Sequence, residues 1–272
     1  MTSQQPQQSM PVGAEGRATR RAALMEQRPP GSPELSIVMP FFNPGPELAA
    51  NVSAVVEALE HTGLSFEVMA VSDGSTDGSA EGIGSLLGDR LRRIDLPAHV
   101  GKGEALRVGL TQGRGRYLGF IDADGDIPAD QLGPFVAAIR TEAVDIVVGS
   151  KRHEDSDVVY PPLRRLYSWG YQQLVRLLFR LNVRDTQTGI KILRRQVLEA
   201  VLPLTNEKRF AFDLELLALA QLLGFDRFQE LPVRIQRRFG STISLPAVAG
   251  IVADTIGIWW RLRVRRSYRA SL

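Results

Sequence analysis

The sequence predicts an α/β fold in which helices cover both faces of a mostly parallel β-sheet. Short apolar runs alternate with helical stretches between residues 35 and 150, and strand–helix alternation at this spacing is typical of such sheets. The 272 residues are 44% hydrophobic, with 25 glycines and 16 prolines. This is the composition of an ordinary globular protein with enough chain to bury a core. The absence of cysteine excludes disulfides, thiolate nucleophiles and cysteine-ligated metals.

Five strands are expected where apolar runs end in polar or glycine-rich loops. They are Leu35–Met39, Phe66–Val71, Leu91–Asp95, Tyr117–Ile121 and Asp145–Val148. Four helical stretches lie between them, at Glu47–His61, Asp77–Leu87, Glu104–Gln112 and Ala129–Arg140. Later helices are expected over Leu163–Leu181 and from Asp213 to Leu223. In a parallel sheet, ligands bind beyond the carboxyl ends of the strands, so the loops that follow the strands are the places to look for chemistry.

Composition divides the chain into three regions. Residues 1–33 are rich in Gln, Pro, Ser, Gly and Arg and are expected to form a disordered tail without the apolar core of a secretory signal. Residues 34–242 are expected to form the α/β domain, and residues 243–272 a basic amphipathic segment. No transmembrane helix is expected, because the most apolar stretch, Leu245–Trp260, is too short and contains Asp254.

Three carboxylates alternate directly after the fourth expected strand, at Asp122, Asp124 and Asp126. Carboxylates this close repel one another unless a cation lies among them, and oxygen ligands suit Mg²⁺ or Mn²⁺. A solvated turn with a helix-capping aspartate is the alternative. The position at the carboxyl end of a strand favours the metal site.

Two other strand-end loops carry polar groups. Gly101-Lys102-Gly103 opens a helix and is suited to a phosphate, through helix-terminus amides and the lysine charge. Asp73 is suited to accept a hydrogen bond from a base or a ribose, with an Asx turn before the next helix as the alternative. The glycines at 82, 84 and 88 lack the spacing and place of a dinucleotide-binding loop, which argues against a nicotinamide oxidoreductase.

Positive charge is concentrated in two late segments, although the net charge is only +3. Pro161–Arg184 holds five arginines and no acid. Its apolar residues form one stripe of a helix, with Arg165, Arg176 and Arg180 on another side, which is typical of a helix lying in a lipid interface. An amphipathic packing helix with a solvated basic face is the alternative. The segment Trp259–Arg269 combines tryptophan and arginine in the same way. No nucleic acid is expected as a partner, because no recognisable nucleic-acid-binding fold accompanies the charge.

Taken together, the strand-end motifs resemble glycosyltransferase family 2, the nucleotide-sugar transferases of the GT-A fold. The motifs are Ser36–Pro40, Ser72–Gly78, Gly101–Ala105 and Asp122–Asp126. Three later motifs are similar to a narrower branch, the dolichyl-phosphate β-glucosyltransferases and related polyprenyl-phosphate sugar synthases. They are Gly149–Arg152, Asp185–Lys191 and Arg209–Glu215. The resemblance extends from about Leu35 to Tyr268.

The resemblance implies a donor site at the strand ends. Asp122 and Asp124 match the pair that holds Mg²⁺ or Mn²⁺ under the donor diphosphate, and Asp126 stands where related synthases place a third metal ligand. The positions implied to line the nucleotide sugar are Pro40, Phe42, Asp73, Lys102, Asp122, Ala123 and Gln187. The chain departs from the family pattern in the loops that meet the base, at Phe42, Pro44 and Ser72.

The resemblance also implies an acceptor site. Arg152, Arg164 and Ser168 match residues that meet the phosphate of a polyprenyl acceptor, and the guanidinium fork binds phosphate oxygens in pairs. Asp213 is the candidate general base if the acceptor is instead a hydroxyl; its other expected role is to begin the helix that runs to Leu223.

The expected function is metal-dependent, inverting transfer of a sugar from a nucleotide diphosphate sugar to a polyprenyl phosphate. UDP-glucose is the favoured donor, because the motif Asp185–Gly189 is more similar to the glucosyl branch than to the mannosyl branch. The enzyme is expected to lie peripherally on the cytoplasmic face of a membrane. The alternative is a soluble family 2 enzyme that acts on a small hydroxylated acceptor.

Overall fold

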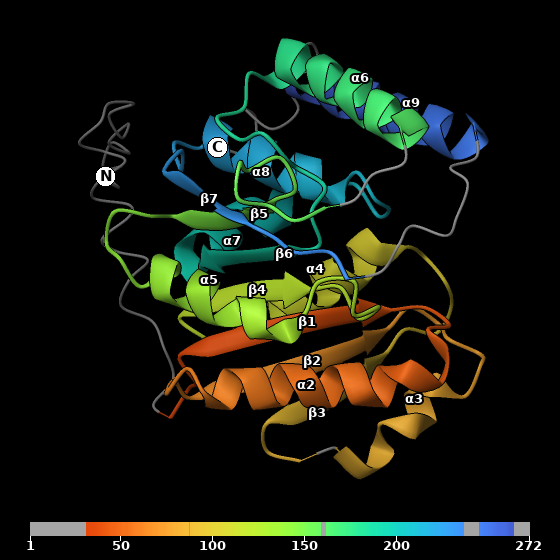
Figure 1. Cartoon of the computed structure of the whole chain (residues 1–272), viewed down its shortest axis with the longest axis vertical. Helices are drawn as coiled ribbons and strands as arrows, with labels where there is room; N and C mark the ends of the chain where they lie inside the picture. Colours follow the sequence, from red (N-terminus) through yellow and green to blue (C-terminus); the bar gives the residue numbers. More distant parts are fainter. Residues whose placement is uncertain (1–30, 87, 159–161, 237–244, 264–272) are drawn as a thin grey trace, which may run out of the picture.

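The computed structural model describes residues 31–86, 88–158, 162–236 and 245–263, and it leaves out the side chains of residues 162–167 and 245–249 (Figure 1). Most of the tail predicted over residues 1–33, and the arginines predicted to anchor the chain beyond Arg263, lie outside the described residues. Within them, one seven-stranded sheet carries helices on both faces. The predicted α/β class is confirmed.

The strands follow the order β3-β2-β1-β4-β6-β5-β7 across the sheet. They are β1 (Leu35–Phe41), β2 (Phe66–Ser72), β3 (Leu91–Asp95), β4 (Tyr117–Ile121), β5 (Ile146–Ser150), β6 (Ile190–Arg194) and β7 (Phe228–Pro232). β6 is antiparallel to its neighbours β4 and β5, and the other pairs are parallel. The five expected strands are present, whereas β6 and β7 fall where the sequence pattern predicts no strand.

Helices cover the sheet in two layers, with a third layer above one of them (Figure 1). They are α2 (Leu48–Glu60), α3 (Ser79–Gly82), α4 (Lys102–Gln112), α5 (Leu132–Ile139), α6 (Pro162–Phe179), α7 (Arg195–Val201), α8 (Phe212–Leu222) and α9 (Leu245–Arg263). Short 3-10 helices are η1 (Gly45–Glu47), η2 (Gly84–Leu86), η3 (Ala129–Gln131) and η4 (Leu202–Leu204).

The alternation of side chains along the strands divides the core in two. On β1, Leu35, Ile37 and Met39 face the cluster that α2 and α5 close. Val38 faces the opposite cluster, which α4, α7 and α8 close. Both clusters consist of residues that are less than a tenth exposed. The sheet is therefore buried on both faces, which leaves its edges and strand ends for function.

The helices α6 and α9 lie side by side at one end of the molecule, above α8 (Figure 1). The hydroxyls of Tyr171 and Thr255 hydrogen-bond between them at 3.0 Å. Val175 of α6 and Ile258 of α9 are buried in the same cluster as α8. Among the described helices, none has the length and apolarity that a bilayer crossing requires.

The stretch expected to be one helix over Asp77–Leu87 is divided into α3 and η2. Glycines at 82 and 84 lower its helix propensity. Asp77 lies before α3, where its Oδ1 accepts hydrogen bonds from the backbone and hydroxyl of Ser79. Its Oδ2 accepts one from the backbone N–H of Gly45 at 2.8 Å. Asp77 therefore ties the loop after β2 to the loop after β1.

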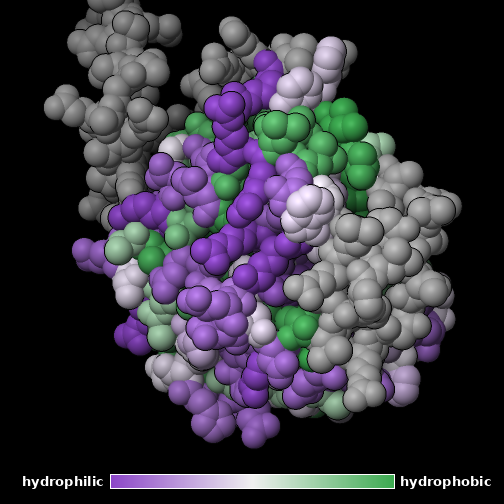
Figure 2. All heavy atoms as spheres, turned by 45° about the horizontal axis from the view of Figure 1, so that its top comes forward, coloured by the Kyte–Doolittle hydropathy of each residue, from purple (hydrophilic) through white to green (hydrophobic). Residues whose placement is uncertain are grey.

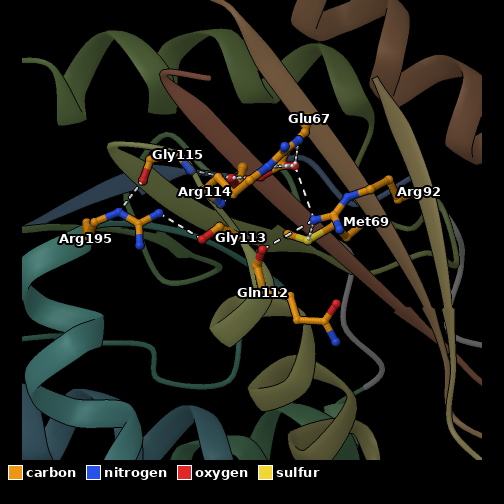
Figure 3. Close-up of polar contacts among 9 residues, drawn as sticks. Glu67, Met69, Arg92, Gln112, Gly113, Arg114, Gly115 and Arg195 are labelled. Carbon is orange, nitrogen blue, oxygen red and sulfur yellow. Dashed lines mark hydrogen bonds and ion pairs between the residues drawn. The ribbon is translucent and has the colours of Figure 1, made fainter. Parts of the chain in front are cut away.

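A polar cluster around the buried Glu67 lies at the end of the sheet where the parallel strands begin (Figure 3). Glu67, with a side chain that is 1% exposed, accepts hydrogen bonds from the guanidinium groups of Arg114 and Arg92 and from the hydroxyl of Ser36. Arg195 donates to the carbonyls of Gly113 and Gly115, in the loop before β4. The cluster fixes the start of β4, the strand that ends at Asp122.

Candidate active site

Four charged side chains of alternating sign lie near the carboxyl ends of the parallel strands. Lys102 begins α4, Asp122 follows β4, Lys191 lies on β6 and Asp213 lies in the first turn of α8. The Nζ of Lys102 is 2.6 Å from Oδ1 of Asp122 and 3.9 Å from Oδ2 of Asp213. Burial lowers the pKa of Lys102, but the negative charges of Asp122 and Asp213 outweigh burial and hold the pKa above its ordinary value. Lys102 is therefore a fixed cation beside the predicted metal ligands.

Asp122 and Asp124 provide carboxylate oxygens that fit a divalent cation. Burial raises the pKa of Asp124, and the neighbouring charge of Asp122 raises it further. A divalent cation between the two carboxylates would relieve this repulsion. Gly189 lies against Asp122, and a Cβ atom at this glycine would collide with the carboxylate. The residues present fit Mg²⁺ or Mn²⁺, which prefer oxygen ligands.

Asp126, the predicted third ligand, contributes backbone contacts to the aspartate loop. In the part of the chain that the structure describes, no three acidic or histidine side chains are grouped so that they could hold a metal ion together. The backbone N–H of Asp126 donates to Oδ1 of Asp124 at 3.0 Å, and its carbonyl accepts from Gln236. The backbone of Asp126 therefore shapes the turn that carries Asp124.

Asn51 of α2 holds the same turn from the other side, and nothing in the sequence pattern points to it. Its Nδ2 donates to the carbonyl of Ala123 at 2.9 Å. Gly125 has a φ of 73° and packs against the Asn51 amide, so that a Cβ there would clash. Ala123 itself is 3% exposed. A contact across 72 residues of sequence thus sets the backbone of the aspartate loop.

Asp73 uses both carboxylate oxygens to hold the loop that leads to Lys102. Oδ1 accepts from the backbone N–H of Val100 and Oδ2 from that of Gly101, each at 2.8 Å. Oδ2 is also 2.8 Å from Nδ1 of His99. Asp73 is 2% exposed. The sequence predicts that this carboxylate contacts the base or the ribose, and the geometry adds a role in positioning Lys102.

An aromatic pair lies at the end of β1. The rings of Phe42 and His99 stack with their centroids 3.9 Å apart and their planes at 25°. Phe42 is 44% exposed, whereas Pro40 is buried within β1. The exposed pair offers a flat surface beside the loop of Asp73.

The loop before β6 is held by Asp185 and leaves polar atoms of its own without partners. Asp185 accepts hydrogen bonds from the backbone of Lys151, the backbone of Gln187 and the hydroxyl of Thr188. Burial raises the pKa of Asp185, but the charge of Lys151 and these hydrogen bonds outweigh burial and hold the pKa below its ordinary value. The Nε2 of Gln187 and the Oγ1 of Thr186 are buried without a hydrogen-bond partner among the described residues. Buried polar atoms of this kind need a partner, which a ligand can supply.

Two of the three predicted acceptor residues are in contact. The Nη2 of Arg152, just after β5, donates to the carbonyl of Ser168 at 2.6 Å and to its hydroxyl at 3.0 Å. Arg164 lies in α6, but its side chain is outside the described residues. Arg152 therefore fixes α6 to the end of β5.

Hydrophobic side chains gather near the end of the molecule that holds α6 and α9, beside a broad hydrophilic area (Figure 2). Large exposed apolar residues of these two helices are Trp169, Leu177, Ile256 and Trp260. Leu177 is 77% exposed. Exposed apolar groups on neighbouring helices indicate a contact surface.

A family model described as glycosyl transferase family 2 matches residues 36–202, which include β1, the aspartate loop, α6 and β6. The chain belongs to glycosyltransferase family 2. It is therefore a glycosyltransferase, and the family expected from its motifs is confirmed.

Relatives within the family include the dolichyl-phosphate β-glucosyltransferases of Drosophila melanogaster and Dictyostelium discoideum. The first is 31% identical over 227 residues and the second 29% over 226, which cover 78% and 77% of this chain and 69% of each relative. Glycosyltransferase AglD of Haloferax volcanii is 30% identical over 85% of this chain, and the match spans only 38% of AglD. These relatives place the chain near the polyprenyl-phosphate sugar synthases that its motifs resemble.

Solved structures share the fold. Mannosyl-3-phosphoglycerate synthase from Rubrobacter xylanophilus has a TM-score of 0.64 at 17% identity, with 93% of this chain and 80% of that chain covered. Glucosyl-3-phosphoglycerate synthase from Mycobacterium tuberculosis, in complex with Mn²⁺, UDP and glucosyl-3-phosphoglycerate, has a TM-score of 0.60 at 17% identity, with 95% and 85% covered. The predicted GT-A fold is confirmed.

Proposed function

We propose that this enzyme transfers glucose from UDP-glucose to a polyprenyl phosphate at the cytoplasmic surface of a membrane, with a divalent cation and with inversion at the anomeric carbon. The observation that carries the proposal is the carboxylate pair Asp122 and Asp124 beside Lys102, at the strand ends where the family binds its donor. The dolichyl-phosphate β-glucosyltransferases among its relatives support the acceptor class and the sugar.

Asp122 and Asp124 would hold the cation beside the donor diphosphate. When bound, Mg²⁺ or Mn²⁺ supplies Lewis-acid stabilisation of the charge that grows on the leaving diphosphate. Lys102 adds a second positive charge at the same place and needs no reorganisation, because its loop is already fixed by Asp73. The unpartnered amide of Gln187 supports a contact to the donor.

A phosphate acceptor removes the need for a general base. A phosphate monoester has its second pKa near ~6, so most of it is already dianionic at neutral pH. Arg152 and Arg164 would orient it, and attack from the face opposite the leaving diphosphate inverts the anomeric carbon. Asp213 is 2% exposed and presents its two oxygens to Lys191 and Lys102. We therefore assign it a counter-ion role in place of the base that a hydroxyl acceptor would require.

The surface of α6 and α9 suits a bilayer as the source of the acceptor. Trp169, Leu177 and Trp260 are half or more exposed. Arg176 and Arg263 lie in the last turns of the two helices. Exposed apolar groups with nearby arginines favour binding to an anionic lipid surface. Arg152, bonded to Ser168 of α6, links this surface to the end of the sheet.

The test is a donor panel. The purified full chain is incubated with Mn²⁺, a polyprenyl phosphate and, in separate reactions, UDP-glucose, UDP-galactose or GDP-mannose. The proposal expects lipid-linked hexose from UDP-glucose, detected by mass spectrometry. A product formed from GDP-mannose alone would overturn the assignment of UDP-glucose as the donor. Transfer to glycerol 3-phosphate or phosphoglycerate, with none to the lipid, would favour the alternative of a small soluble acceptor.

A further inference from the structure

Lys191 is a fully buried lysine that the proposed mechanism does not use. Burial lowers its pKa, and the carboxylate of Asp213 opposes that shift by favouring the ammonium form. Its side chain on β6 is 0% exposed, and its strand partner on β4 is Phe120. A lysine is almost never buried completely unless a counter-charge lies beside it. Lys191 is the second residue of β6 and follows the loop that carries Gln187, Thr188 and Gly189.

The contacts of Lys191 lead from the interior to the metal ligands. Its Nζ lies 2.5 Å from Oδ1 of Asp213 and donates to the carbonyl of Thr188 at 2.7 Å. The other oxygen of Asp213, Oδ2, faces Lys102 at 3.9 Å, and Lys102 contacts Asp122 at 2.6 Å. The four residues Lys191, Asp213, Lys102 and Asp122 form a charge chain that alternates in sign.

The ring of Phe120 lies near both lysines of the charge chain. The ring centroid is 5.1 Å from the Nζ of Lys191 and 5.9 Å from that of Lys102. Both ammonium groups therefore lie near one aromatic ring, and Asp213 is the anion between them. Lys191 has no exposed part, while Lys102 retains 17% exposure toward the site.

We propose that Lys191 is a positioning residue for sugar transfer: it holds the carboxylate of Asp213, and Asp213 in turn leaves Lys102 free to act at Asp122 and the donor diphosphate. The proposal rests on the proposed function and deepens it.

The physical reason is that the ammonium group of Lys102 lies near two carboxylates, those of Asp122 and Asp213. Asp213 is 2% exposed and cannot obtain much stabilisation from water. With Lys191 present, a fixed ammonium satisfies it. Without Lys191, the ammonium of Lys102 is the nearest remaining lysine charge, and the buried carboxylate draws it inward, away from Asp122. The rate of sugar transfer then falls, although Lys191 is expected to contact neither the donor nor the acceptor.

The test is a double-mutant cycle. Lys191→Met keeps the chain length and removes the charge. We expect it to lower kcat on the order of 30-fold, which is the size of coupling seen between charged groups in contact, with the acceptor KM changed less than about 3-fold. In a Lys102→Ala background the same substitution should lower kcat less than about 3-fold further. Lys191→Arg should restore part of the rate.

Two controls separate positioning from structure. Arg194, also on β6, is 6% exposed and donates to the carbonyls of Val144 and Thr141. Arg194→Met should lower the melting temperature, and any effect on kcat should be the same with Lys102 or Ala at position 102. UDP binding measured by calorimetry in EDTA supplies a readout independent of transfer. Lys191→Met and Lys102→Ala should weaken it to a similar extent, and their combination no further.

A second variant tests the inference if Lys191→Met does not fold. The pair Lys191→Met with Asp213→Asn buries no uncompensated charge, and we expect it to fold and to have the kcat of Asp213→Asn alone. Additive losses of kcat in the Lys102→Ala cycle, or a further loss in this pair, would overturn the inference while leaving the proposed function intact. A wild-type protein that neither binds UDP nor transfers glucose would overturn both.

Discussion

For the carboxylate of Asp124, stability of the fold favours the neutral form, whereas the proposed metal binding requires the ionised form. Burial and the charge of Asp122 both raise its pKa, which means that the folded protein disfavours its ionised form. A cation reverses this balance, because it needs both carboxylates ionised. At neutral pH without metal, Asp124 is therefore expected to cost stability that Mn²⁺ restores.

Asp124→Asn is expected to abolish transfer, at least about 100-fold in kcat, while the melting temperature in EDTA rises or stays unchanged. The sign follows from the raised pKa, since a neutral amide removes a disfavoured charge. Thermal melts with and without Mn²⁺ check this, and the variant should lose the stabilisation that Mn²⁺ gives the wild type. A variant that keeps the Mn²⁺ stabilisation and the turnover would contradict the metal role.

Glu67 lies at the other end of the sheet, where the parallel strands begin (Figure 3). Burial raises its pKa, but hydrogen bonds from Arg114 and Ser36 outweigh burial and hold the pKa below its ordinary value. The ionised form therefore stabilises the fold above the unfolded pKa of about 4.3, and the contribution is lost as the pH falls below it.

Glu67→Gln is expected to lower the free energy of unfolding by about 1–3 kcal/mol at pH 7, since it weakens buried charged hydrogen bonds. The difference from wild type should shrink near pH 3.5. Urea unfolding at both pH values measures it. Glu60→Gln is the matched control, because Glu60 and Arg90 form an exposed pair that contributes little. An equal effect at both pH values would contradict the assignment.

The sequence singles out residues whose expected roles show in the local pattern, and it misses residues whose contacts are distant in sequence. Asp122 and Asp124 are identified because they follow a strand directly. Asn51 and Lys191 are not, because their roles depend on contacts across 72 and 22 residues of sequence. Asp73 is found, but the pattern gives no sign that both its oxygens are bonded to the 99–101 loop.

Among the elements, β6 brings the loop of Gln187 and Gly189 against Asp122. The backbone N–H of Asp122 donates to the carbonyl of Gly189 at 2.9 Å. The strand runs antiparallel to β4, so it begins where β4 ends. Strand–helix alternation predicts parallel strands, which is why the antiparallel β6 is missed, while the apolar stripe of α6 is found.

Gly189→Ala tests this close approach, because the added Cβ would collide with the Asp122 carboxylate. We expect at least about a 10-fold loss of kcat, the effect of misplacing a reacting group by a fraction of an ångström. Gly133→Ala, on α5, is the matched control, since nothing lies within 4 Å of its Cβ position. Steady-state assays compare the two, and equal activity of both variants would contradict the packing.

The helices α6 and α9 give a second prediction at this scale. Leu177 is 77% exposed, so Leu177→Glu should leave the melting temperature within about 2 °C of wild type. It should reduce sedimentation with anionic liposomes at least about 5-fold, because it places a negative charge on the apolar surface. Leu86→Glu, on η2 and 37% exposed, is the control. Equal binding of both variants would contradict the membrane surface.

At the scale of the whole molecule, the stabilising polar cluster and the candidate active site lie at opposite ends of the strands. The Glu67 cluster lies where the parallel strands begin, and their carboxyl ends carry Asp122, Asp124 and Lys102, with α6 and α9 at one end of the molecule (Figure 1). The fold class and the family are both predictable from the order of elements and motifs. The inter-helix contact of Tyr171 and Thr255 is not, since no pattern specifies which helices pair.

The central claim is that Asp122 and Asp124 bind a divalent cation together with the donor diphosphate. Crystals of the full chain grown with Mn²⁺ and UDP test it directly through the anomalous signal of manganese. The account predicts one manganese peak bonded to oxygens of Asp122 or Asp124 and to the diphosphate, with Lys102 within hydrogen-bond reach of a phosphate oxygen. UDP bound elsewhere, with no manganese at either aspartate, would contradict it.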